Sequence, residues 1–125
     1  MVEPTPDAAL DSLIDAIATQ DLPSTLGALS LIHEPAVIGS EGGEAARGRA
    51  TVEAFFRRIY ARPGAFRFEF AQRSWVVHDD VTWLVAEGTV VEPDSAAPKP
   101  YRLTAVFVRE ESHWKLVLWS GSEPA

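Results

Sequence analysis

Glu87 is the residue of this sequence best suited to acid or base chemistry. The segment Trp83–Thr89 alternates as a strand does, and Glu87 falls on the side that carries large apolar residues. A carboxylate in such surroundings is costly to keep charged unless it is paired or lines a wet cavity. Glu87 is therefore the candidate catalytic group, and a one-residue bulge that turns it to solvent is the alternative.

Several polar residues are expected near that carboxylate. Gln72, Thr89 and Ser120 fall on the same predicted sheet face. Tyr60, near the end of a predicted helix, could place its hydroxyl over the same cavity, and a half-buried ring at a helix end is the alternative. Together these side chains would supply hydrogen bonds to a bound molecule.

The glycine-rich segment 39–44 carries two further carboxylates, Glu41 and Glu44. Either could reach the cavity mouth as the partner of the first carboxylate, since paired carboxylates with separated pKa values do acid/base work. Solvated loop charges are the alternative. The segment lacks the Lys-Ser/Thr of a phosphate loop, so it does not predict nucleotide binding.

Metal and cofactor sites are not expected. The chain has no cysteine, which excludes disulfides and thiolate ligands. Its three histidines, His33, His78 and His113, lack the helical i, i+4 spacing of a zinc pair.

Composition points to one small acidic domain over residues 1–125. Eighteen acidic residues against eleven basic ones give a net charge of −7, which argues against a nucleic-acid surface. The basic cluster Arg57, Arg58 and Arg62 is interpreted as the solvated side of a helix. No signal peptide and no apolar run of about 20 residues is present, so a cytoplasmic protein without a membrane span is expected.

Hydrophobic periodicity predicts helices first and strands afterwards. Thr5 can cap the first helix and Asp21 the second, over about 22–31. A short strand at 35–39 precedes a third helix at about 49–61, and four strands follow at about 66–78, 81–92, 100–110 and 113–122. The predicted fold is α+β: a curved antiparallel sheet of four long strands and one short strand, wrapped around three N-terminal helices. A sheet curled around so few helices leaves a pocket at one end.

Turn lengths give a register for the sheet and hence a lining for the pocket. Two-residue turns are expected at 79–80 and 111–112, and Glu92 is taken to oppose Pro100. The face assigned to helices and pocket then presents large apolar groups around the polar ones. Its lining is predicted as Phe68, Phe70, Trp83, Tyr101 and Phe107 around Gln72, Glu87, Thr89 and Ser120.

The opposite face is too apolar for a plain solvent surface. In this register it carries Trp75, Val106, Val117 and Trp119. Contiguous apolar patches commonly mark partner surfaces. A homodimer packed through this side of the sheet is therefore expected.

The element order and several segments resemble the nuclear transport factor 2-like superfamily, SnoaL-like branch. The matching segments are 38–44 before Gly48-Arg49, 80–88, 101–104 and 114–120. The resemblance implies a cone-shaped α+β barrel, usually dimeric through the outer sheet face. Arg102 matches a frequent arginine of the family and is carried as a pocket candidate, although the register puts it on the outer face. Ser120 stands where many relatives place a histidine, and no counterpart of an isomerase Tyr plus Asp pair is visible.

The family includes cyclases, ketosteroid isomerases, dehydratases and non-catalytic domains, so the resemblance leaves the activity open. The first hypothesis is a domain that binds a small apolar or aromatic ligand in its pocket. The alternatives are an acid/base enzyme of cyclase, isomerase or dehydratase type that uses Glu87, and a non-catalytic dimeric association module.

Overall fold

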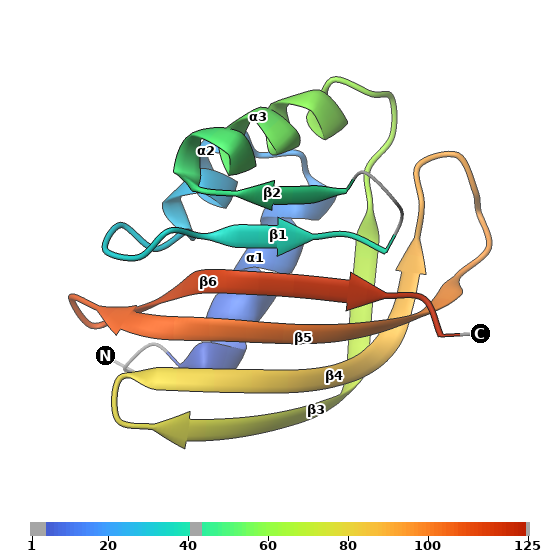
Figure 1. Ribbon diagram of the computed structural model, residues 1–125. Helices are drawn as coiled ribbons and strands as arrows, with labels where there is room; N and C mark the ends of the chain where they lie inside the picture. The colour runs from blue at the N-terminus through green and yellow to red at the C-terminus, as the bar shows by residue number, and fades with distance from the viewer. Residues whose placement is uncertain (1–4, 41–43, 125) are drawn as a thin grey trace.

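The computed structural model describes residues 5–40 and 44–124 and contains three helices and a six-stranded sheet among them (Figure 1). The elements are α1 (Pro6–Ala18), α2 (Leu22–Gly27), β1 (Ala36–Ile38), β2 (Ala45–Arg47), α3 (Arg49–Tyr60), β3 (Arg67–His78), β4 (Val81–Val91), β5 (Lys99–Glu110) and β6 (His113–Ser122). No helix within the described part of the chain is long and apolar enough to cross a membrane.

The helix starts follow the capping residues read from the sequence. The Thr5 side chain accepts a hydrogen bond from the Ala8 amide at 3.1 Å, and Asp21 caps α2 through the Ser24 amide at 3.2 Å. The second helix is shorter than predicted. It ends at Gly27, because the chain beyond it bonds to β6 instead: the Leu116 amide donates to the Ala28 carbonyl at 2.8 Å.

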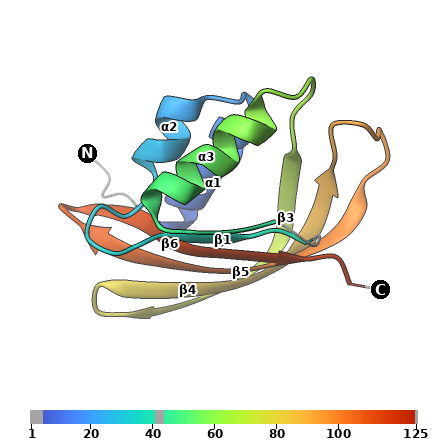
Figure 2. The same cartoon turned by 45° about the horizontal axis from the view of Figure 1, so that its top comes forward.

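The sheet runs in the order β2-β1-β6-β5-β4-β3 and carries all three helices on one side (Figures 1 and 2). Strand β2 was predicted as loop; it pairs antiparallel with β1, Ala46 opposite Val37. Strand β1 in turn pairs parallel with β6. The architecture is α+β with a curved, unclosed sheet, but the sheet has six strands rather than five and is not wholly antiparallel.

Both predicted hairpin turns are confirmed. His78 pairs with Val81, and Glu110 pairs with His113. Asp79 has a φ of 54°, and the two residues of the second turn have φ of 50° and 68°. Positive φ values are typical of two-residue turns whose twist matches that of the strands.

A bulge in β3 changes which residues face the helices. The pairing with β4 shifts between Glu69 and Gln72, where the chain bends sharply (Figure 1). Gly88 permits the bend, because a Cβ there would lie 1.8 Å from the Glu69 carbonyl oxygen. Beyond the bulge Arg73 and Trp75 turn inward, and Gln72 turns outward.

Arg73 ties β3 to the first helix. Its guanidinium donates to Asp7 at 2.9 Å and to Asp11 at 2.8 Å, and the Trp75 indole also donates to Asp7 at 3.0 Å. The hydrogen bond from Arg73 holds the pKa of Asp7 below its ordinary value. Helix α1 is thereby fixed across the concave face of the sheet.

Glu110, at the end of β5, holds the segment between α2 and β1. The carboxylate is 7% exposed and accepts hydrogen bonds from the Ser30 hydroxyl and, at 2.9 Å, from the Leu31 amide. Burial by itself raises the pKa of Glu110, but these bonds, one from the Ile32 amide and the charge of His33 lower it below its usual value of 4.5.

Replacing Glu110 by Gln should lower the free energy of unfolding at pH 7 by about 1–3 kcal/mol, because one buried acceptor oxygen is lost. The depressed pKa stabilises the fold above the unfolded value of 4.5 and ceases to do so as the pH falls through the folded value. The difference between Glu110→Gln and wild type in urea unfolding should therefore shrink at acidic pH. The exposed neighbour supplies the control, Glu111→Gln, which should change little. Equal stability of Glu110→Gln and wild type at pH 7 would contradict this account.

Candidate functional site

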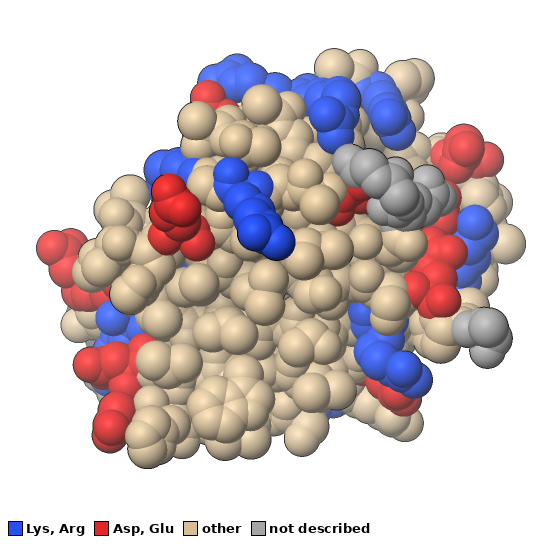
Figure 3. Space-filling model, viewed as in Figure 1, with Lys and Arg blue, Asp and Glu red and all other residues tan. Residues whose placement is uncertain are grey.

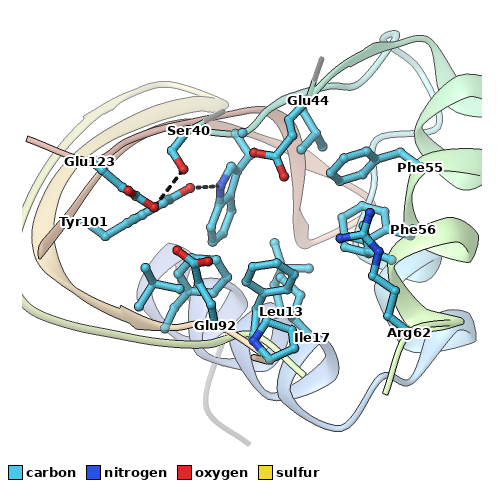
Figure 4. Close-up of a pocket in the computed structure, with 18 of the residues that line it drawn as sticks. Leu13, Ile17, Ser40, Glu44, Phe55, Phe56, Arg62, Glu92, Tyr101 and Glu123 are labelled. Atoms are coloured by element: carbon cyan, nitrogen blue, oxygen red, sulfur yellow. Dashed lines mark hydrogen bonds between the residues drawn. The ribbon is translucent and has the colours of Figure 1, made fainter. Parts of the chain in front are cut away.

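A cavity of about 420 Å³ lies between the helices and the bent end of the sheet (Figure 4). Leu13 and Ile17 of α1 form one wall, and Phe55, Phe56 and Ile59 of α3 form another. The sheet contributes the remaining apolar lining: Val37, Phe66, Phe68, Val90, Tyr101, Leu116 and Trp119.

Aromatic rings dominate the sheet side of the cavity. The Phe68 ring lies 5.0 Å from that of Tyr101 and 5.1 Å from that of Trp119, between ring centroids, and both contacts are tilted rather than stacked. Phe66 and Phe68 are parallel at 6.3 Å. Such edge and offset arrangements are favourable between rings and leave ring faces available to a planar guest.

Tyr101 supplies a positioned hydroxyl within this aromatic surface. The Trp119 indole donates to its oxygen at 3.1 Å. Because an indole N–H can only donate, Tyr101 accepts in this bond and keeps its own O–H for another acceptor. Gly121 makes room for the hydroxyl: a Cβ at that position would lie 1.6 Å from the oxygen. Burial raises the pKa of Tyr101 to about 12, so the hydroxyl stays protonated at neutral pH.

The rim of the cavity is charged. Glu44, Glu92, Asp94 and Glu123 line it together with Arg62. Lys99 bonds to Glu92 at 3.1 Å, and the Ser40 hydroxyl donates to Glu123 at 3.2 Å. Figure 4 shows Arg62 on the opposite side of the cavity from Glu123.

Of the residues predicted for the pocket, Phe68 and Tyr101 line the cavity. Phe70 and Phe107 are buried on the same face, 4% and 1% exposed, but pack behind the lining. Tyr60 does not reach the cavity. Its hydroxyl bonds to the Thr25 hydroxyl at 2.8 Å and is thereby tied to α2.

The prediction of which β4 side chains face the helices was wrong. Ala105 opposes Leu84, not Glu87, because the loop between β4 and β5 sets a register three residues away from the one assumed. An odd shift moves every side chain of a strand to the other face. Leu84, Ala86 and Val90 therefore point inward, and the outer face receives Trp83, Glu87 and Thr89.

Glu87 consequently lies outside the cavity. Its carboxylate is 52% exposed and pairs with the Arg102 guanidinium at 3.0 Å on the outer face. Gln72 lies opposite Glu87 on the neighbouring strand and is exposed too. The outer side of the sheet thus carries Glu87, Gln72, Thr89 and Arg102. For Arg102 this agrees with the predicted register and not with the pocket position suggested by the family resemblance.

A second bulge, in β6, reverses the predicted faces of Trp119 and Ser120. Phe107 pairs with Leu116 but Val106 pairs with Leu118, so Val117 is an extra residue in β6. Trp119 is buried in the cavity wall, and Ser120 does not line it. Trp75 and Trp119 were both predicted on the outer face, because the strands were taken to alternate without a bulge. Both lie on the inner face.

Sequence reasoning missed the rim. Glu92 was predicted as the end of a strand and Pro93 as the start of the following loop, and neither Asp94 nor Glu123 was a candidate. The available signal was the presence of acidic residues directly after two of the predicted strands. Glu44 does lie at the rim, whereas Glu41 lies outside the described residues. Within the described ranges no group of three or more His, Asp or Glu could hold a metal ion.

The SnoaL-like domain family matches residues 7–125 of the chain. Among solved structures, a protein from Thiobacillus denitrificans, provisionally described as a calcium/calmodulin-dependent protein kinase type II association domain, is 25% identical with a TM-score of 0.82 over 100% of this chain and 99% of that one. A provisionally described dehydratase of the NTF2-like family from Streptomyces avermitilis is 17% identical, with a TM-score of 0.83 over 97% and 99% of the two chains.

An NTF2-like protein of unknown function from Pseudomonas putida is 15% identical, with a TM-score of 0.80 over 94% and 83% of the two chains. Likenesses at 15% and 17% identity show the fold alone. No curated protein matches the chain. The chain belongs to the SnoaL-like domain family.

Proposed function

We propose that this protein binds a small apolar or aromatic molecule in the cavity between its helices and its sheet. The observation that carries the proposal is the aromatic cavity itself, whose 420 Å³ lies in the range of about 300–1,000 Å³ typical of ligand pockets. The helices would close the narrow end of the cone expected of the family, with the ligand at its wide end.

The polar groups of the cavity favour binding over acid/base catalysis. The candidate base Glu87 lies on the other side of the sheet, so it cannot transfer a proton to or from a molecule in the cavity. Tyr101 keeps its proton at neutral pH because of its raised pKa and is a donor rather than a base. A ligand with its rings against Phe68 and Trp119 could place a carbonyl or ether oxygen at this hydroxyl.

Tyr101→Phe should weaken ligands that carry an acceptor and spare those that do not. With 2-acetylnaphthalene and the acceptor-free 2-isopropylnaphthalene as probes, the substitution should weaken the acetyl compound about 3- to 10-fold. It should leave the isopropyl compound within about twofold, since that compound accepts no hydrogen bond from the Tyr101 hydroxyl. Both affinities can be measured by titration calorimetry.

Tyr60→Phe is the matched control, because Tyr60 bonds to Thr25 and does not line the cavity. It should leave both affinities unchanged. The proposal fails if the folded protein binds neither probe.

A homodimer through the outer sheet face is the second functional candidate. Val76, Trp83 and Val85 are 45%, 42% and 49% exposed there, and Figure 3 shows a broad surface without charged side chains across this side of the sheet. Glu87 and Arg102 neutralise each other on it, so two copies of this face can approach without charge repulsion. The likeness to a provisionally described association domain supports self-association.

Val85→Glu should disrupt such a dimer, because it would bury a carboxylate in each half of a two-fold interface. The apparent dissociation constant should rise more than about tenfold, measured by light scattering across a dilution series. Val77→Glu is the control. Val77 is 56% exposed but lies on the same side of β3 as Trp75, away from the proposed interface. A wild-type protein that is monomeric at high micromolar concentration would refute the dimer.

A cytoplasmic location stays a prediction.

A further inference from the structure

The mouth of the cavity is acidic on its sheet side. Glu92 and Asp94 lie where the chain leaves β4, Glu123 lies just after β6, and Glu44 precedes β2. Among the described lining residues Arg62 is the one basic side chain. Residues far apart in the sequence thus bring four carboxylates to one opening.

Neighbouring cations offset these carboxylates only in part. Lys99 pairs with Glu92, whose side chain is 17% exposed. Arg62 is exposed and belongs to the far wall (Figure 4). Ser40 donates a hydrogen bond to Glu123 but adds no positive charge. A surplus of negative charge therefore remains at the mouth.

Two side chains already respond to this negative potential. A hydrogen bond to Glu92 raises the pKa of the Lys99 ammonium, and the charges of Glu123 and Asp94 add to the effect. Deeper in the cavity, burial is the main cause of the raised pKa of Tyr101, but Glu44 and Glu123 contribute as well. The potential that favours an ammonium group thus extends from the rim to the aromatic lining, where it disfavours an anion.

The lining itself suits a cation. Phe55, Phe56, Phe66, Phe68 and Trp119 surround the space behind the carboxylates. The faces of such rings attract ammonium groups, and more strongly when water is excluded. An amine that enters past the rim would therefore exchange water for carboxylates on one side and ring faces on the other.

We propose that the cavity selects basic aromatic or apolar amines and disfavours carboxylic acids of the same shape. The apolar body would lie among the rings, with the ammonium group toward Glu123, Asp94 and Glu92. This inference rests on the proposed binding function and names the chemical class of the ligand.

Three probes with one ring system test the selection: 2-(aminomethyl)naphthalene, 2-naphthalenemethanol and 2-naphthoic acid. The amine should bind about 5- to 20-fold more tightly than the alcohol, and the acid about 3- to 10-fold more weakly, by Coulomb energies at partly exposed sites. The amine's advantage should shrink in about 1 M salt, where the screening length falls to about 3 Å. The affinity of the alcohol should not fall.

The double variant Asp94→Asn/Glu123→Gln removes two rim carboxylates. It should reduce amine binding about 3- to 10-fold and leave the alcohol within about twofold. The matched control is Asp79→Asn/Glu53→Gln, which changes the net charge equally. Asp79 lies in the β3–β4 turn, and Glu53 pairs with Arg57 on the solvent side of α3. The control should retain the amine preference.

The outcomes separate the two proposals. If none of the probes binds to the folded protein, the binding function itself fails. If the alcohol binds but the amine binds no better, or if the acid binds most tightly, the pocket stands and the charge selection is wrong. A preference for the amine that is undiminished in Asp94→Asn/Glu123→Gln also overturns the role given to the rim.

Discussion

Side chains of a β-strand alternate between two faces, and every irregularity of one residue reverses that alternation. In this protein two bulges and one loop length therefore govern what the cavity contains. The bulge in β3 turns Arg73 and Trp75 toward α1, and the extra residue Val117 in β6 turns Trp119 into the cavity wall. The loop after β4 sets the register that brings Val90 inside and leaves Glu87 outside.

The inward-turned polar residues then anchor the helices. Arg73 holds α1 through two aspartates, and Glu110 holds the segment that follows α2. Neither Arg73 nor Glu110 lines the cavity. Helix α1 lies against the flatter part of the sheet (Figure 1). The bent end of the sheet stands away from the helices, and the cavity forms in the space between them.

Within that space the groups present suit the proposed ligand binding. Water exclusion strengthens the hydrogen bond that Tyr101 can donate and at the same time keeps its proton in place. The charged groups gather at the mouth, where solvent can still reach them, while the interior offers rings. The opposite face of the same strands carries a neutral ion pair and exposed valines, and it is the surface proposed for a second copy.

Local sequence determined the elements of this protein. The caps at Thr5 and Asp21, the two-residue turns and the change from helical to strand periodicity all depend on neighbours within a few residues, and the structure has them. The inward face of β5, with Tyr101, also followed from alternation alone. The tertiary structure decided the rest. Bulges and loop registers arise from packing between distant strands, because a large ring such as Trp119 gains more from burial than an uninterrupted ladder would provide. For the same reason the acidic mouth, assembled from three separate segments, could not be read from the sequence by itself.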